Sequence, residues 1–369
     1  MAAVVRVIDA SLGSRAQVRL SVDSVSDPEQ LRTTWASSGA MVERLGDQLH
    51  AISTVVALER AAGRCLPPSE AGLLEQSARD AVRAWTGPTP PLRIAGSVLE
   101  CVRPAVMGVC NVTPDSFYDG GVVYPDGHPD AAVSRARGLA RDGAALVDVG
   151  GESSRPGSAP VPVEEELDRV LPVVSELAGA GIGVSIDTTK AKVAGAAIDA
   201  GARVVNDVSG GNPALLEAVA ASDAGYVLMH VRGTPADMQQ RTTYDDVVAE
   251  VYGFLAEGIA RCEAAGIERE RVAIDPGIGF AKTPEQSVAL LRAIPQLRGL
   301  GRPVLIGASR KSFLRALHGG ESSEERLEAS LAAAALAAAD GAAILRVHDV
   351  AETVRAVDVA IALRREPVG

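Results

Sequence analysis

Polar and charged side chains follow a series of short apolar runs in the larger, C-terminal part of the chain. The side chains at these run ends are Asn111, Asp187, Asn206, Asp275, Arg310, Lys311, Arg346 and His348. Carboxylates and amides together can hydrogen-bond a flat heterocycle that presents several donors and acceptors. Arginine, lysine and histidine instead favour an anionic group such as a phosphate or a carboxylate. The residues therefore predict a site for a polar aromatic ligand that carries an anion.

The same residues favour one type of chemistry over others. The amide oxygen of Asn111 can bind a hard cation such as Mg²⁺, which prefers oxygen ligands and often bridges a protein to substrate phosphates. The sequence has no evident Ser-His-Asp or Cys-His arrangement, and the stretch SRKS (residues 309–312) lacks the glycine pattern of a P-loop. We therefore expect departure of a phosphate leaving group through positioning and charge stabilisation, without a covalent intermediate.

Composition excludes several classes of protein. The 369-residue chain has a formal net charge of −11 at pH 7 and no run of lysines and arginines, which weighs against nucleic acid as a partner. Its four cysteines are scattered, without the spacing of a zinc site or a disulfide framework. The apolar stretches fall short of the roughly 18 residues of a membrane span, and the N-terminus lacks a secretory signal pattern. We expect a cytoplasmic protein that binds neither nucleic acid nor a membrane.

A repeated unit must position the polar residues. From about residue 105 onward, a short β-branched run is followed by a polar corner and then by a segment with helical spacing, eight times in all. The expected strands are residues 105–110, 145–150, 183–187, 203–208, 226–231, 271–277, 303–309 and 343–349. Apolar strands that alternate with helices predict a parallel α/β sheet, and this number of units matches a (β/α)8 TIM barrel. An open doubly wound sheet is the alternative, but its glycine fingerprint after the first strand is absent.

The barrel prediction brings the polar residues together, because a TIM barrel builds its active site on the loops at the C-terminal ends of its strands. We expect this barrel to span residues 93–369. Residues 1–92 differ in pattern and predict a small α/β appendage, joined by the proline-rich linker at residues 86–91. Helical spacing within the appendage occurs at residues 51–65 and 67–85.

Seven stretches of the chain, in their order, resemble the dihydropteroate synthase family of the folate pathway. They are MGVCNVTPDSFYDGG, LVDVGGESSRPGS, VSIDTTKAKVAGAAIDAGARVVNDVSGG, VLMHVRGTPADMQ, AIDPGIGFAKTPEQSVALL, PVLIGASRKSFL and RVHDVAETVRA, covering roughly residues 94–365. The resemblance implies a transferase that condenses 6-hydroxymethyl-7,8-dihydropterin diphosphate with 4-aminobenzoate, giving 7,8-dihydropteroate and pyrophosphate. It also implies Mg²⁺ as cofactor, a homodimer seam at the alanine-rich helix of residues 329–339, and a target of sulfonamides.

The resemblance assigns roles to residues of the mouth. The pterin-binding set is matched by Asp187, Asn206, Asp275 and Lys311. The Mg²⁺ ligand is matched by Asn111, which also joins Arg346 and His348 around the diphosphate. The neighbourhood of the aminobenzoate is matched by Ser154, Arg155, Pro156, Phe280, Lys311 and Ser312. The residues expected to carry catalysis are Asp187, Asp275, Lys311, Arg346 and His348.

The reaction implied by the resemblance needs no nucleophilic side chain. In its dissociative, SN1-like course, loss of pyrophosphate leaves a cation on the pterin CH₂ group, which the ring delocalises and the arylamine then attacks. Asp187 and Asp275 are expected to hold the positive charge on the pterin. Mg²⁺, Arg346 and His348 are expected to stabilise the leaving diphosphate.

Three positions depart from the family pattern, which has Thr, Gly and Ser where this chain has Ser154, Ala281 and Tyr118. A Cβ at residue 281 is costly if that position needs a positive φ. In the sequence alone, His230 is more simply a packed, hydrogen-bonded residue than a ligand, and the acidic run at residues 163–168 is most simply a solvated helix start.

Two other functions remain open from the sequence. One is a methyltransferase that passes a methyl group from methyltetrahydrofolate to a corrinoid, but its substrate has no diphosphate for Arg346 and His348 to bind. The other is a non-catalytic paralogue that binds a pterin, or that binds a partner through the N-terminal appendage.

Overall fold

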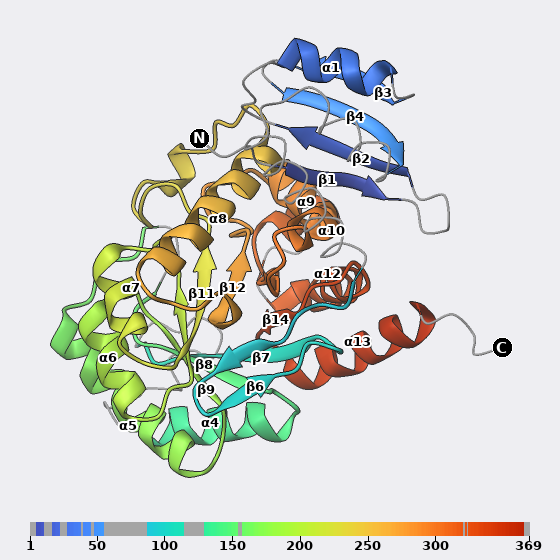
Figure 1. Cartoon of the computed structure of the whole chain (residues 1–369). Helices are drawn as coiled ribbons and strands as arrows, with labels where there is room; N and C mark the ends of the chain where they lie inside the picture. Colours follow the sequence, from blue (N-terminus) through green and yellow to red (C-terminus); the bar gives the residue numbers. More distant parts are fainter. Residues whose placement is uncertain are drawn as a thin grey trace. The chain divides into compact units, whose positions relative to one another are not determined.

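The computed structural model describes residues 5–10, 17–22, 28–37, 40–45, 48–54, 87–113, 129–153, 157–319, 322 and 324–364. The chain divides into two compact units, coloured along the sequence in Figure 1. One unit comprises Met1–Thr89 and Ala293–Arg302, and the other comprises Pro90–Arg292 and Pro303–Gly369. In the described ranges, no helix is long and apolar enough to cross a membrane.

The larger unit is a barrel of eight parallel strands. These are β7 (Ala105–Asn111), β8 (Leu146–Gly150), β9 (Val184–Asp187), β10 (Val204–Asp207), β11 (Gly225–Met229), β12 (Val272–Asp275), β13 (Leu305–Ile306) and β14 (Ile344–Val347). They pair in the order β12-β11-β10-β9-β8-β7-β14-β13, and a parallel bridge between Ile274 and Val304 brings the two ends of the sheet together. The predicted TIM barrel is confirmed, and each strand overlaps its predicted range, although β13 is much shorter than the predicted residues 303–309.

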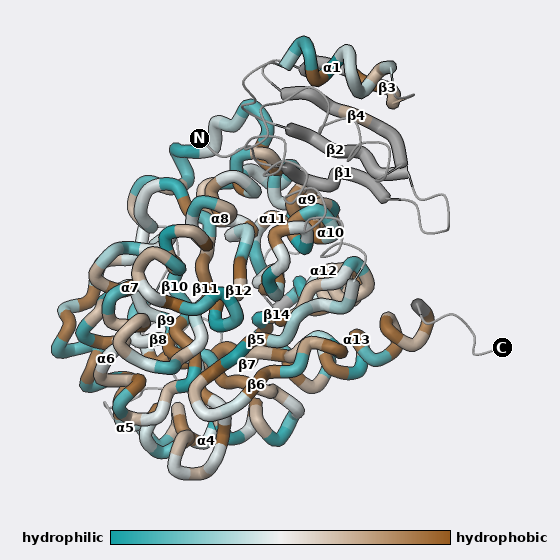
Figure 2. Tube along the Cα trace, viewed as in Figure 1, coloured by the Kyte–Doolittle hydropathy of each residue, from teal (hydrophilic) through white to brown (hydrophobic). Residues whose placement is uncertain are grey.

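Helices cover the strands, which explains the continuous apolar runs. Every residue of β8 to β12 is buried, as expected for parallel strands covered on both faces. The helices of this unit are α4 (Asp130–Arg141), α5 (Val163–Gly179), α6 (Ala191–Asp199), α7 (Pro213–Ala220), α8 (Val247–Ala264), α9 (Pro284–Arg292), α11 (Phe313–His318), α12 (Leu327–Ala339) and α13 (Val350–Arg364). In Figure 2 helices α4, α5 and α8 carry both hydrophobic and hydrophilic residues, as one-sided packing requires.

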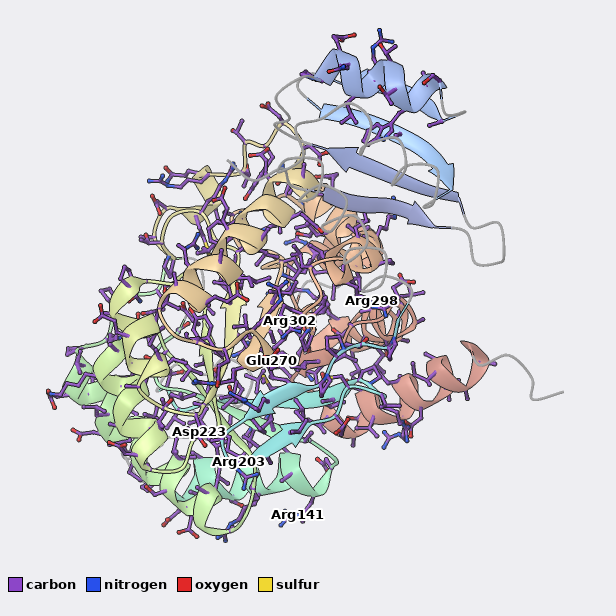
Figure 3. The ribbon with its side chains drawn as sticks, viewed as in Figure 1. Arg141, Arg203, Asp223, Glu270, Arg298 and Arg302 are labelled. Carbon is purple, nitrogen blue, oxygen red and sulfur yellow. The ribbon has the colours of Figure 1, made fainter. Side chains whose placement is uncertain are left out.

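A hairpin fills the N-terminal end of the barrel. Its strands are β5 (Leu92–Ile94) and β6 (Ser97–Leu99). The buried apolar cluster at this end contains Leu92, Ile94, Cys101, Ala105, Met107, Leu146, Val204, Val227, Ala273, Leu305, Ala343 and Ile344. Arg203, Asp223 and Glu270, which precede β10, β11 and β12, mark this end of the strands in Figure 3. Since side chains occupy this end, the loops at the opposite, C-terminal end are free to form the site.

The smaller unit contains an antiparallel sheet in the order β1-β2-β4-β3, formed by β1 (Val5–Ala10), β2 (Gln17–Val22), β4 (Gln48–Thr54) and β3 (Met41–Leu45). Helix α1 (Pro28–Ser37) buries Leu31 and Trp35. Helix α10 (Ile294–Arg298) belongs to this unit, and Arg298 Nη2 donates to the Gly87 carbonyl at 2.7 Å.

The helix expected at residues 51–65 is wrong at its start, because residues 51–54 belong to β4. This strand pairs with β2 on one side and β3 on the other, and that pairing overrides the local helical spacing. Residues 55–86, with the second expected helix, lie outside the described residues.

Candidate active site

Arg346 joins the ends of several strands across the mouth of the barrel. From β14, its Nε donates to Asp148 Oδ2 at 2.6 Å and its Nη2 donates to Asp187 Oδ2 at 2.6 Å. Asn206 Nδ2 donates to the same Asp148 oxygen at 3.1 Å. The structure thus gathers three of the predicted residues around Asp148, a residue to which the sequence assigned no role.

Burial sets the electrostatics of this network. Asp148 is fully buried and Asp187 is 9% exposed. Burial raises the pKa of Asp187, Arg346 opposes this rise, and the nearby Asp148 adds to it. Burial also disfavours the charge on Arg346, but Asp148 and Asp187 outweigh it and raise the pKa of the guanidinium. The arginine therefore stays charged and holds the carboxylates in place.

Lys311 faces a second carboxylate and an aromatic ring. Its Nζ donates to the Ile278 carbonyl at 2.5 Å and lies 4.5 Å from the centroid of the Phe280 ring. Burial lowers the pKa of Lys311 to about 8, and the charge of Asp275 opposes this. The Asp275 carboxylate itself accepts from Gly277 N at 2.7 Å. Lys311 thus lies between a predicted pterin residue and a predicted aminobenzoate residue.

The loop after β12 has an unusual backbone. Gly277, Gly279 and Ala281 all have positive φ, at 68°, 79° and 51°. Glycine adopts this region freely, whereas alanine pays for its Cβ. Ala281 is fully buried, so the surrounding structure holds it in this conformation. The cost expected at residue 281 if its φ were positive therefore applies.

Lys282 and His230 form a buried pair beside this loop. Lys282 Nζ lies 3.0 Å from His230 Nδ1 and donates to the Phe280 carbonyl at 2.8 Å. Burial lowers the pKa of Lys282 to about 7, and burial together with the Lys282 charge lowers the pKa of His230 to about 2. The interpretation of His230 as a packed, hydrogen-bonded residue is confirmed, and the sequence did not single out its partner Lys282.

His348 and Arg310 have different surroundings although both were expected to face an anion. The His348 ring Nδ1 lies 3.1 Å from Ser309 Oγ, and its backbone N donates to the same hydroxyl at 3.2 Å. Arg310 Nε donates to Asp349 Oδ2 at 2.7 Å, and the arginine side chain is 6% exposed. Arg310 is therefore held by a structural ion pair, because the carboxylate that follows His348 in the chain lies against it.

A further polar cluster joins the loops after β8 and β9. Lys190 pairs with Glu152 and with Glu166, and Thr188 Oγ1 donates to Glu166 at 2.6 Å. The expectation of a solvated acidic helix start is wrong for Glu166, which is fully buried. It holds for Glu164, whose side chain is 74% exposed. Helix α5 therefore directs Glu164 outward and Glu166 toward the mouth.

A cavity of about 260 Å³ opens beside Asp187. Its lining consists of Glu152, Ser153, Glu166, Asp187, Thr188, Thr189, Val208, Ser209, Val231, Gly233, Thr234, Pro235, Met238 and Phe280. A cavity that holds a benzene molecule measures about 150 Å³, so this one accommodates a ring-sized ligand. Its lining combines carboxylates, hydroxyls and apolar side chains, which suits a polar aromatic molecule.

Asn111 lies at the edge of the same network, at the end of β7. A Cβ placed on Gly150 would lie 3.7 Å from Asn111 Oδ1 and 3.7 Å from Asp187 Oδ2, so the two oxygens flank one point above this glycine. Among the described residues, no three His, Cys, Asp or Glu side chains form a group that could hold a metal ion. Asn111 Oδ1 is the kind of oxygen ligand that a hard cation prefers, whereas Asp187 Oδ2 accepts from Arg346 Nη2 at 2.6 Å.

The remaining predicted residues are less well placed. Ser312 is exposed, directly before α11. Ser154, Arg155 and Pro156 lie outside the described residues, as does Tyr118. Of the residues predicted to surround the aminobenzoate, the structure thus describes Phe280, Lys311 and Ser312.

Comparison with known proteins identifies the family. Residues 107–348 match the family model described as pterin binding enzyme. The dihydropteroate synthase of Escherichia coli K12 is 46% identical over 269 residues, which cover 72% of this chain and 93% of that protein. The chain belongs to the dihydropteroate synthase family.

Two further members of the dihydropteroate synthase family extend the comparison. The Mycobacterium leprae dihydropteroate synthase is 49% identical over 262 residues, 69% of this chain and 91% of that protein. The structure of Xanthomonas albilineans dihydropteroate synthase with 4-aminobenzoic acid has a TM-score of 0.70 and 48% identity, and it covers 76% of this chain and 100% of that one. Nearly the whole length of these relatives is therefore represented here.

Proposed function

We propose that this protein is a dihydropteroate synthase, a transferase that joins 6-hydroxymethyl-7,8-dihydropterin diphosphate to 4-aminobenzoate and releases pyrophosphate. The observation that carries the proposal is the Arg346 network, in which Asp148, Asp187 and Asn206 meet at one mouth in a chain of this family. The name of the Xanthomonas albilineans relative and its bound 4-aminobenzoic acid support the same reaction.

In this proposal the pterin lies against Asp187, Asn206, Asp275 and Lys311. A pterin ring presents N–H donors to carboxylates and ring nitrogens and a carbonyl to cations, which matches this mixture of groups. Two carboxylates at strand ends also favour positive charge on the ring once the CH₂–O bond breaks. Since Arg346 Nη2 holds Asp187 and the Gly277 amide holds Asp275, little reorganisation accompanies the reaction.

The diphosphate is proposed to bind on the side of Arg346, His348 and Asn111. A guanidinium has five N–H donors, and the bonds from Nε and Nη2 to the two aspartates leave others for phosphate oxygens. His348 is oriented by Ser309, which fixes the face that its ring presents. We propose Asn111 as a ligand of Mg²⁺, which when bound would offset the negative charge of the leaving diphosphate.

The arylamine is proposed to bind between Phe280, Lys311 and Ser312, with Ser154, Arg155 and Pro156 nearby. The carboxylate of 4-aminobenzoate needs a cation, and the flat ring of Phe280 stands against the Lys311 ammonium. The amine attacks the pterin cation directly. Its weak basicity means that no strong general base is required.

The proposal also includes the organisation of the protein. Residues 1–92 are proposed as an appendage and residues 93–369 as the catalytic barrel. We propose a homodimer that packs through α12, where Leu336 is 67% exposed among small alanines, and a cytoplasmic location. Light scattering on a size-exclusion column tests the dimer, since a monomer at micromolar concentration would contradict it.

The central experiment is an assay of the purified protein with the pterin diphosphate, 4-aminobenzoate and Mg²⁺. We expect 7,8-dihydropteroate and pyrophosphate in equal amounts. A folded protein that binds the pterin diphosphate without turnover would instead support the non-catalytic paralogue, and methyl transfer from methyltetrahydrofolate to a corrinoid would support the methyltransferase.

Lys311→Ala provides a check on the site. The ammonium lies between Asp275 and Phe280, so its loss should weaken the binding of both substrates and lower kcat/KM by about 100-fold or more. Steady-state kinetics with each substrate varied in turn measure this. Turnover at the wild-type rate in this variant would contradict the assignment.

A further inference from the structure

Lysine is rare in this chain. Of its 36 lysines and arginines, four are lysines: Lys190, Lys192, Lys282 and Lys311. Lys282 is 4% exposed, and a buried ammonium is costly unless its hydrogen bonds are satisfied. A compact ammonium at a buried position, in a chain that uses arginine for most of its cations, indicates a geometric requirement that the larger guanidinium does not meet.

Two hydrogen bonds define that requirement. Lys282 Nζ donates to the Phe280 carbonyl at 2.8 Å and lies 3.0 Å from His230 Nδ1, which accepts because the ring is neutral. A Cβ on Gly277 would lie 2.0 Å from the His230 carbonyl and 3.4 Å from Lys282 Nζ. The ammonium is therefore enclosed between the start of this loop and the residue that follows β11.

The loop between β12 and α9 needs such support because of its backbone. Its residues 277, 279 and 281 all have positive φ, and residue 281 is an alanine. The carbonyls of the two intervening residues, Ile278 and Phe280, each accept from a lysine, the first from Lys311 and the second from Lys282. These bonds hold the Phe280 ring against the Lys311 ammonium.

We propose that Lys282 is a positioning residue for the arylamine substrate: by bonding the Phe280 carbonyl to His230, it fixes the loop so that Phe280 and Lys311 together form the aminobenzoate side of the mouth. This inference rests on the proposed function and adds a residue to it. Lys282 acts through Phe280 and does not itself contact the reacting atoms.

The residues proposed for the two substrates are held in place by different parts of the structure. Asp275, the pterin residue nearest this loop, is held by the sheet, since it pairs in register with Met229 and its carbonyl accepts from His230 N at 2.9 Å. Phe280 lies beyond the strand, and its position depends on the loop. Loss of Lys282 should therefore weaken the binding of 4-aminobenzoate much more than that of the pterin diphosphate.

The test is a steady-state comparison of Lys282→Met with the wild-type protein, both assessed for folding by thermal unfolding. We expect the KM for 4-aminobenzoate to rise about tenfold or more and the KM for the pterin diphosphate to change less than twofold. Lys282→Gln keeps an N–H donor for the Phe280 carbonyl and should give an intermediate KM. Lys192→Met is the matched control, because Lys192 is 64% exposed and pairs with Glu164 on the outside of the barrel.

A double-mutant cycle with Phe280→Ala separates positioning from general stability. If Lys282 acts through Phe280, Lys282→Met should have little further effect on the KM for 4-aminobenzoate once the ring is removed. Additive effects, equal changes in both KM values, or wild-type kinetics of Lys282→Met would each overturn the proposal. If Lys282→Met does not fold, the same criteria apply to Lys282→Gln. Absence of product with the wild-type protein would refute the proposed function, which distinguishes that failure from this one.

Discussion

At the scale of single residues, the site depends on charges that are buried together. Arg346 contacts both Asp148 and Asp187, and these carboxylates are 0% and 9% exposed. Removal of the arginine would leave two carboxylates in the barrel without their shared cation. Breaking a buried ion pair in this way costs more than the pair itself contributes, because the remaining charge stays desolvated.

We therefore predict that Arg346→Met loses both activity and stability. The free energy of unfolding should fall by about 3–5 kcal/mol, measured by urea denaturation, and dihydropteroate formation should fall by about 100-fold or more. Arg355→Met is the control, because Arg355 is 69% exposed and pairs with Glu352 on α13, where the effect should stay below about 1 kcal/mol. Equal stability of the two variants would contradict the buried network.

His230 provides a prediction of pH dependence. Its pKa is about 2 in the folded protein against 6.5 for an ordinary histidine, so below pH 6.5 the unfolded chain binds a proton that the folded chain does not. Stability should fall as the pH falls, and this residue should contribute a loss of about 2 kcal/mol between pH 7 and pH 5.

Denaturation of wild-type protein and His230→Gln at several pH values measures this contribution. The glutamine does not titrate, so its stability should decline less steeply toward acid. Parallel pH curves for the two proteins would show that His230 takes up its proton in the folded state.

At the scale of elements, the loop after β12 is the part of the site most sensitive to its backbone. Gly277 has a φ of 68°, and a Cβ there would meet the His230 carbonyl at 2.0 Å. That carbonyl belongs to the backbone after β11 and cannot rotate away as a side chain would. The loop and the neighbouring strand end must therefore shift together if residue 277 gains a side chain.

We predict that Gly277→Ala is destabilised by about 2–4 kcal/mol, through both the left-handed backbone and the overlap, and that its KM for 4-aminobenzoate rises. Gly253→Ala, in α8, is the contrasting variant. No atom lies within 4 Å of its Cβ position, so it should be stabilised by about 0.5–1 kcal/mol. Thermal and urea unfolding distinguish the two, and an unchanged Gly277→Ala protein would contradict the described contact.

At the scale of the whole molecule, the two compact units are not two consecutive parts of the chain. Residues Ala293–Arg302 belong to the compact unit of the first 89 residues, although they lie between α9 and β13. Leu92, by contrast, belongs to the apolar cluster that fills the barrel end. Truncation after residue 89 therefore leaves the barrel cluster intact, whereas truncation after residue 92 removes Leu92 from it.

We predict that deletion of residues 1–89 lowers the Tm by about 5 °C, because α10 loses the rest of its unit and Arg298 loses the Gly87 carbonyl. Differential scanning calorimetry measures the change. Arg298→Ala in the full-length protein is the control and should reproduce a smaller part of it. Unchanged Tm and unchanged kinetics after the deletion would mean that the segment Ala293–Arg302 does not depend on residues 1–89.

The barrel and the position of its mouth could be predicted from the sequence because both depend on residue patterns within each strand and its following loop. Alternating β-branched and helical segments predicted the barrel, and a polar residue after each strand predicted the mouth, since parallel strands all end at one edge. The resemblance in seven ordered stretches indicated the family, and the comparisons confirmed it. The expected helix at residues 51–65 was wrong at its start, where pairing of β4 with two other strands prevailed. The expectation of a solvated helix start was wrong for Glu166, which tertiary packing buries.

Only the tertiary structure determined which side chains pair with one another. Asp148 as the centre of the Arg346 network, Glu166 as a buried carboxylate and Lys282 as the bond between Phe280 and His230 all involve residues far apart in the chain. The sequence determined which groups meet at the mouth because strand direction alone places them there. Which of them pair depends on side-chain directions and burial, which exist only when the barrel is closed.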